Sequence, residues 1–95
     1  MTFDKYTIKA QEAVQAAVQA AQQGRQQSVE PVHLLVGIVD KGKDIVNFVF
    51  QKLGVNAQSI AMALQQELQH LPKVDGGQPY FSKETAGVFS EAEKI

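Results

Sequence analysis

An internal repeat limits what this chain can fold into more than any other feature of its sequence. Residues 6–17 (YTIKAQEAVQAA) have a counterpart 75 positions later at residues 81–92 (FSKETAGVFSEA). In each copy an aromatic residue precedes a hydroxyl residue, and small and apolar residues follow at helical spacing. A repeat at a fixed period indicates one supersecondary unit used twice, with each unit covering the other's apolar face. The second copy reaches only Ile95, inside its first helix, so we expect the chain to be a fragment of a larger domain.

The first half of the chain carries the start and stop signals of two helices. Thr7 is a good N-cap for the first helix, and Gly24 is placed to end it. The inward stripe of this helix is mostly alanine, which lets a neighbouring helix approach closely. Glu30-Pro31 then opens a second helix, because proline is favoured at the first helical position. This helix is apolar nearly all round, and we expect it to be the buried centre of the unit.

Two more helices follow in the predicted first unit. Asp44 is expected to cap the third helix, which Gly54 ends. Residues 46–50 also have strand propensity, but the capping residues on both sides favour a helix. Asn56 caps the fourth helix and Pro72 terminates it.

A polar, glycine-containing segment separates this unit from the second copy of the repeat. Ser82 then caps a fifth helix, as Thr7 caps the first. The sequence therefore predicts an all-α fold. Residues 1–72 form a four-helix unit, residues 73–80 a linker, and residues 81–95 the first helix of a second, pseudo-symmetric unit.

Composition excludes several classes of partner. Lys plus Arg is 9 and Asp plus Glu is 10, for a net charge of −1. A chain with this charge balance has no strong positive field to attract nucleic acids or anionic membranes, so we expect neither as a partner. There is no cysteine for a disulfide or a thiolate metal site. The N-terminus lacks the apolar core of a signal peptide, and no run is long enough to span a membrane. We therefore expect a soluble, cytoplasmic chain.

One stretch is similar to a phosphate-binding loop. Residues 37–44 match G-x-x-x-x-G-K, but Asp44 stands where Ser or Thr should bind magnesium. The preceding segment has the pattern of a helix, whereas such a loop follows a strand. A glycine that ends one helix before the next N-cap is the better interpretation.

The two histidines, His33 and His70, do not form a recognisable site either. A metal or catalytic role for His33 would need partners at ligand spacing, and Glu30 alone does not supply them. A hydrogen bond that fixes the start of the second helix is the favoured role for His33. We expect no enzyme activity, no metal and no cofactor in this fragment.

Apolar residues near the start of the second repeat allow two interpretations. The set is Tyr80, Phe81, Val88 and Phe89. Aromatic clusters usually belong to the core. The alternative is a shallow apolar groove between the two units, where an unfolded segment or a partner docks.

The sequence resembles the Clp N-terminal repeat domain, which begins the double-ring AAA+ unfoldases ClpA, ClpC and ClpB. Residues 30–35 (EPVHLL), after an alanine-rich helix, carry the most recognisable part of this resemblance, which extends over the whole chain. Residues 71–74 (LPKV) with Gly76-Gly77 favour the ClpB-type chaperones, which are disaggregases.

The resemblance implies the N-terminal substrate-engaging domain of an ATP-dependent disaggregase or unfoldase. Such a domain binds exposed apolar segments of unfolded or aggregated polypeptides through an apolar groove between its repeats. The parent protein would be a homohexamer, and ATP and magnesium would bind in AAA+ modules absent from this sequence. The alternative implied function is docking of an adaptor or co-chaperone, as in ClpA- and ClpC-type unfoldases that serve proteases. A helical interaction domain with no chaperone role is the default that the resemblance argues against.

Four residues are the substrate-binding candidates. Thr7 matches a polar position that the family associates with substrate handling, although its capping role explains it equally well. The groove candidates are Phe81, Val88 and Phe89. Because the second repeat is unfinished, we also expect the chain to self-associate or to swap its fifth helix with a second copy.

Overall fold

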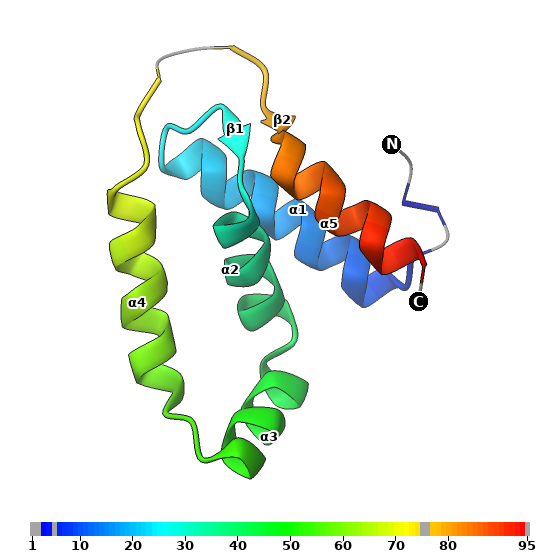
Figure 1. Cartoon of the computed structure of the whole chain (residues 1–95), viewed down its shortest axis with the longest axis vertical. Helices are drawn as coiled ribbons and strands as arrows, with labels where there is room; N and C mark the ends of the chain where they lie inside the picture. The colour runs from blue at the N-terminus through cyan, green and yellow to red at the C-terminus, as the bar shows by residue number, and fades with distance from the viewer. Residues whose placement is uncertain (1–2, 5, 75–76, 95) are drawn as a thin grey trace.

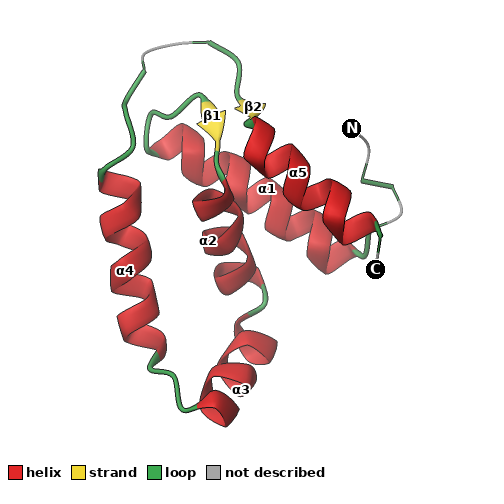
Figure 2. Ribbon diagram, viewed as in Figure 1, coloured by secondary structure: helices red, strands yellow, loops and turns green. Residues whose placement is uncertain are grey.

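The computed structural model of the chain describes residues 3–4, 6–74 and 77–94. Its elements follow in the order α1 (Ile8–Gln23), β1 (Ser28–Val29), α2 (Pro31–Lys41), α3 (Lys43–Leu53), α4 (Ala57–Gln69), β2 (Tyr80–Phe81) and α5 (Lys83–Glu93). Figure 1 shows α1 and α2 crossing near the middle, α5 in front of α1 in this view, α4 to the left of α2 and α3 below it. Helices dominate the ribbon in Figure 2, so the predicted all-α class is confirmed.

Small residues bring α1 and α2 together, as the alanine stripe predicts. Ala17 and Ala21 are fully buried on α1. Gly37 of α2 lies directly against the α1 backbone. A methyl group at Gly37 would overlap the carbonyl oxygen of Ala13 and lie 3.1 Å from the amide nitrogen of Ala17. The pair packs closely because neither helix has a bulky side chain at this crossing.

Most predicted caps are confirmed. Thr7 Oγ1 accepts a hydrogen bond from the Ala10 N–H at 3.1 Å, and Asn56 Oδ1 accepts one from the Gln58 N–H at 2.9 Å. Ser82 Oγ accepts one from the Thr85 N–H at 3.1 Å. These side chains satisfy N–H groups that have no partner inside the helix.

Three details differ from the sequence predictions. Gly24 ends α1 as predicted, but with φ at −84°, and the left-handed conformation falls on the next residue, Arg25, with φ at 60°. Gly42 caps α3 through its backbone alone, so Asp44 lies in the first turn and is not the cap. The fourth helix ends at Gln69, before Pro72.

The expectation that α2 is the buried centre of the unit is only half right. His33, Leu34 and Gly37 are buried, whereas Leu35 is 42% exposed and Ile38 is 47% exposed. The buried side of α2 packs on α1. The other side faces α3 and α4, which cover it incompletely.

A two-residue parallel pairing was missed by the sequence analysis. Ser28 of β1 pairs with Tyr80 of β2, and Val29 pairs with Phe81. The linker predicted at residues 73–80 therefore ends inside a strand. Its residues 75–76 lie outside the described residues, as do residues 1–2, 5 and 95, so the predicted domain boundaries stay a prediction.

The core lies between α1, α2, β1 and α5. Its buried members are Val14, Ala17, Ala21, Val29, Leu34 and Phe89, and the partly buried residues packed on them are Phe3, Tyr6, Val18 and Phe81. By contrast, α3 has no buried residue and α4 has only Leu64. The described part of the chain has no helix with the length and apolar character needed to cross a membrane.

Candidate interaction surfaces

Four aromatic rings hold α5 and the N-terminal segment together. Phe89 lies 4.9 Å from Phe3 and 5.2 Å from Phe81 between ring centroids, both edge to face. Tyr6 contacts Phe3 at 5.2 Å. Such edge-to-face pairs add about 0.5–1.5 kcal/mol each to the free energy of simple burial. The cluster therefore fixes α5 against the first unit.

Tyr6 brings a polar atom into this apolar cluster. Its hydroxyl oxygen is buried and has no hydrogen-bond partner among the described residues. Burial raises the pKa of Tyr6, and the negative charge of Glu93 raises it further. The phenol is therefore neutral and contributes packing to this region.

The four predicted binding residues lie in different environments. Phe89 is only 4% exposed and belongs to the core, while Val88, its neighbour on α5, is 45% exposed. Phe81 is partly buried in β2, and Thr7 is exposed at the start of α1. The structure thus brings Phe81 and Phe89 together but leaves Thr7 and Val88 outside their cluster. The assignment of these four residues to substrate binding stays a prediction.

Phe81 borders a hollow on the side of α1, which we call the α1–β2 groove. It has a volume of about 420 Å³. Its lining combines apolar side chains with glutamine amides of α1 and consists of Phe3, Gln11, Val14, Gln15, Val18, Gln19 and Phe81. Gln11 is fixed there, because its side-chain amide donates to the carbonyl oxygens of Phe3 at 3.1 Å and Tyr6 at 3.0 Å.

A buried hydroxyl pair joins α5 to β1. Thr85 Oγ1 donates to the carbonyl oxygen of Val29 at 2.7 Å and accepts from Ser82 Oγ at 3.0 Å. Thr85 is fully buried. Sequence reasoning missed Thr85. Its position on the inward-facing side of the fifth helix could have indicated a buried hydroxyl that needs a hydrogen-bond partner.

A second groove lies where α1 meets the junction of α2 and α3, and we call it the junction groove. Its volume is about 510 Å³. Ala10, Ala13, Ile38, Ile45 and Val46 supply the apolar part of its lining, and Lys9, Asp40, Lys41, Lys43 and Asp44 supply charges of both signs. Lys9 crosses the groove, since its ammonium donates to the Lys41 carbonyl oxygen at 3.3 Å. The loop-like stretch 37–44 is the end of α2 followed by the start of α3, which does not fit a phosphate-binding loop.

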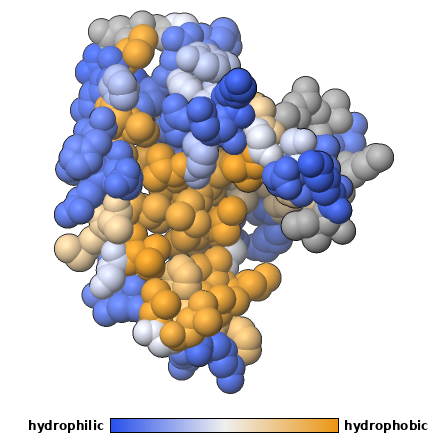
Figure 3. All heavy atoms as spheres, viewed as in Figure 1, coloured by the Kyte–Doolittle hydropathy of each residue, from blue (hydrophilic) through white to orange (hydrophobic). Residues whose placement is uncertain are grey.

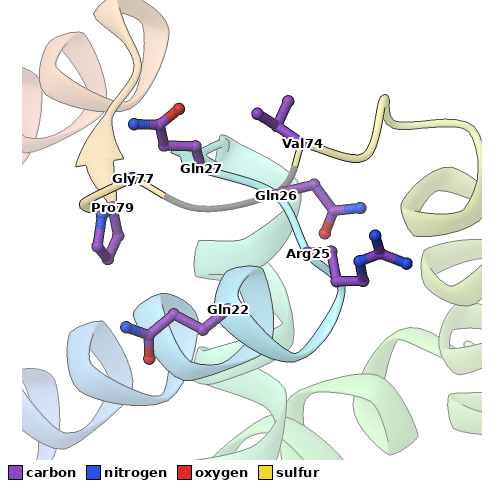
Figure 4. Close-up of a pocket in the computed structure, with 7 residues that line it drawn as sticks. All are labelled: Gln22, Arg25, Gln26, Gln27, Val74, Gly77 and Pro79. Carbon is purple, nitrogen blue, oxygen red and sulfur yellow. The ribbon is translucent and has the colours of Figure 1, made fainter.

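The turn after α1 forms a smaller polar pocket of about 180 Å³. Figure 4 shows the side chains of Gln22, Gln26 and Gln27 around it, with Arg25 beside them. The Val74 N–H donates to the Arg25 carbonyl oxygen at 2.7 Å, which joins the segment after α4 to this turn. The pocket therefore lies at a connection between two segments of the backbone.

Close to this pocket, His33 closes the start of α2. Its Nδ1 accepts a hydrogen bond from the Glu30 N–H at 2.9 Å, and its Nε2 lies 3.4 Å from Gln26 Oε1. The imidazole is fully buried, and burial lowers the pKa of His33 more than the nearby Glu30 raises it. The predicted structural role of His33 is confirmed. In the described residues, no three His, Asp or Glu side chains gather in a way that could hold a metal ion.

The last surface is a broad apolar area that the sequence analysis did not identify. Figure 3 shows apolar residues gathered over α2 and α3 and reaching toward α4. The exposed large apolar residues on these helices include Leu35, Ile38, Ile45, Phe48, Val49, Leu53 and Met62. Isolated apolar residues are common on protein surfaces, but a continuous area of this kind is typical of an interaction site.

Comparison with known proteins gives a consistent set of relatives. Residues 5–95 match the family model described as Clp repeat (R) N-terminal domain. The chain is 47% identical over 92 residues to "Chaperone protein ClpB" of Bacteroides thetaiotaomicron, covering 97% of this chain and 11% of the relative. The protein of the same name from Porphyromonas gingivalis is 45% identical over 93 residues, covering 98% of this chain and 11% of the relative. That of Brucella suis is 33% identical over 97 residues, covering 100% of this chain and 11% of the relative. The chain thus spans about a tenth of the length of these relatives.

Proposed function

The chain belongs to the Clp repeat (R) N-terminal domain family, and from this membership we propose that it engages substrates for an ATP-dependent disaggregase or unfoldase. In this proposal it binds exposed apolar segments of unfolded or aggregated polypeptides. It performs no catalytic step itself. The parent protein acts in the cytoplasm as a homohexamer, and ATP and magnesium bind in AAA+ modules outside this sequence.

The α1–β2 groove is the observation that carries this proposal. Its apolar lining residues, Phe81 among them, suit the side chains that an unfolded chain exposes. Its glutamines can donate to and accept from the backbone of an extended segment whatever the sequence of that segment. A surface of this kind favours weak binding of many unfolded chains over tight binding of one.

A titration with a permanently unfolded protein and its folded counterpart tests the proposal. We expect the chain to bind only the unfolded form, as followed by NMR or fluorescence. The informative variant is Gln15→Glu/Gln19→Glu, because both residues lie on α1 and line the groove. Two carboxylates at the groove edge must lose water when an apolar segment docks, so binding should weaken at least ~3-fold.

Gln65→Glu/Gln69→Glu is the matched control. It adds the same charge at the same spacing on α4, away from the groove, and should leave the affinity unchanged. If the unfolded protein does not bind at all, the substrate-engaging function is wrong. If it binds equally well to both double variants, the function stands but the groove is elsewhere.

Adaptor docking is the alternative function, and the junction groove favours it. Its lining combines apolar residues with charges of both signs, which suits a site for one folded partner. Binding of an adaptor should weaken as salt rises, because exposed charges are screened. The Lys43→Glu variant should then lose an adaptor while still binding unfolded chains.

A further inference from the structure

We infer that the apolar face of α3 is a docking surface for a second copy of this chain, with the two α3 helices packed antiparallel across a two-fold axis. This contact is separate from the α1–β2 groove of the proposed function. We call it the α3 face and define it by Ile45, Phe48, Val49 and Leu53. The sequence predicted self-association, or exchange of the fifth helix with a second copy. We instead assign the contact between copies to the α3 face.

Helix α5 does not need a partner to cover it. Phe89 is 4% exposed and Thr85 is fully buried, so the inward side of α5 is satisfied within one copy. The uncovered apolar surface lies on α3 instead. Ile45 is 72% exposed, Phe48 60% and Leu53 70%, and no residue of α3 is buried. These positions repeat at helical spacing, so they form one stripe along the helix.

The area of this stripe suits a small dimer. A fully buried aliphatic or aromatic side chain removes ~100 Å² of apolar surface from water, so the exposed parts of the four residues provide ~250 Å² per copy. Interfaces are about 60% apolar, which implies ~400 Å² of total surface per copy. The resulting ~800 Å² is the size of a weak, transient contact.

The charges on α3 favour an antiparallel arrangement. The first turn of this helix holds Asp44 next to Lys43, and the last turn holds Lys52. Asp44, Phe48 and Lys52 follow at intervals of four residues, so they share one side of the helix, on which Lys43 does not lie. Phe48 lies midway between Asp44 and Lys52 in the sequence. A two-fold axis at Phe48 therefore brings Asp44 of one copy opposite Lys52 of the other, twice, while the two Phe48 rings meet. Such an isologous contact closes on itself and stops at two copies.

The low net charge of −1 allows this contact, because two copies repel each other little. In addition, the Lys52 ammonium lies over the Phe48 ring, at 5.5 Å from its centroid. The Lys52 ammonium therefore lies beside the Phe48 ring, at the border of the apolar surface that the second copy covers.

Sedimentation equilibrium between ~10 µM and ~1 mM tests the inference. The chain should pass from monomer to dimer within this range, as a small interface requires. Phe48→Glu should raise the dissociation constant at least ~10-fold, because it puts two carboxylates together at the centre of the contact. Lys52→Glu should raise it ~3-fold through loss of the exposed ion pair.

Ile8→Glu is the matched control. Ile8 is 70% exposed on α1, so the same kind of substitution there should leave the dissociation constant unchanged. Circular dichroism verifies that all variants keep their helices. A monomer at every concentration overturns the inference. A dimer that survives Phe48→Glu also overturns it and points to exchange of α5, while association beyond two copies excludes the two-fold contact.

The outcomes also separate this inference from the proposed function. If Phe48→Glu abolishes binding of the unfolded protein and the wild-type chain is monomeric, the α3 face is a substrate surface and the inference is wrong. If Gln15→Glu/Gln19→Glu abolishes substrate binding but the dimer persists, both the groove and the α3 face are supported.

Discussion

At the scale of single residues, His33 couples the stability of the fold to pH. The Glu30 N–H donates to Nδ1, so the proton of the neutral ring is on Nε2, facing Gln26 Oε1. A second proton on Nδ1 would point at the Glu30 N–H, so two donors would face each other and this hydrogen bond would be lost. Burial is the first cause of the lowered pKa of this imidazole, against an opposing effect of Glu30.

The direction of this pKa change sets the direction of the pH effect. Below pH 6.5, the ordinary pKa of histidine, His33 is protonated in the unfolded chain but stays neutral in the folded chain until the pH reaches its lowered pKa. The contribution of His33 to the free energy of unfolding is therefore complete above pH 6.5 and is lost as pH falls toward the lowered folded value. Urea unfolding between about pH 5 and 7.5 should give a slope of at most about 1.4 kcal/mol per pH unit below the ordinary pKa.

The two histidines provide the variant and its control. His33→Gln keeps an acceptor for the Glu30 N–H but does not titrate, so the slope below the ordinary pKa should largely disappear. His70 is exposed at the end of α4, and His70→Gln should keep the slope. A slope that persists in His33→Gln would assign the effect to another group.

At the scale of elements, Thr85 is the residue that joins α5 to β1. Its hydroxyl donates to the Val29 carbonyl oxygen and accepts a hydrogen bond from Ser82 Oγ. Thr85→Val keeps the volume but removes the hydroxyl, leaving Ser82 without its acceptor. Since the site is fully buried, the free energy of unfolding should fall by about 1–3 kcal/mol in urea denaturation.

A double-mutant cycle with Ser82→Ala checks that the two hydroxyls act together. Their single losses should not add, and a coupling of at least about 0.5 kcal/mol is expected for groups in one hydrogen-bond network. Thr85→Ser supplies the control, because it retains the hydroxyl and should lose less stability than Thr85→Val. Strict additivity would mean that the two hydroxyls stabilise the fold independently of each other.

The elements also mark how far the sequence could predict the fold. The caps at Thr7, Asn56 and Ser82 were predictable because each involves a side chain and an amide two or three residues away. The pairing of Val29 with Phe81 and the bond from Thr85 to Val29 were not, because they join segments far apart in the chain. No local pattern specifies which distant carbonyl a buried threonine meets.

At the scale of the whole molecule, the same distinction applies to the candidate sites. Phe81 and Phe89 were identified as members of one aromatic set, but the sequence could not tell that Phe89 is core and that Phe81 borders the α1–β2 groove. The apolar run in α3 predicts a helix but not what covers it. Only the arrangement of α2, α3 and α4 revealed that one copy of the described chain leaves this stripe uncovered.

This uneven burial predicts uneven local stability across the molecule. The core joins α1, β1, α2 and α5, whereas α3 contributes no buried residue and α4 only Leu64. Few buried contacts allow local opening at low free energy. In a dilute sample, hydrogen exchange should therefore be at least ~10-fold less protected in α3 than in α1 and α2, a difference of about 1.4 kcal/mol in opening free energy.

Hydrogen exchange measured at several protein concentrations then shows whether α3 is weakly held in every state or is stabilised when a second copy covers it. If a second copy docks on the α3 face, protection of the α3 amides should rise as the sample is concentrated into the dimeric range, because binding stabilises the closed form by mass action. The α1 amides, which already open only with the core, should change less. Phe48→Glu should remove the concentration dependence while leaving the low protection of α3. Protection of α3 equal to that of α1 in dilute samples would contradict the view that this molecule has a firm core and a loosely held α3 and α4.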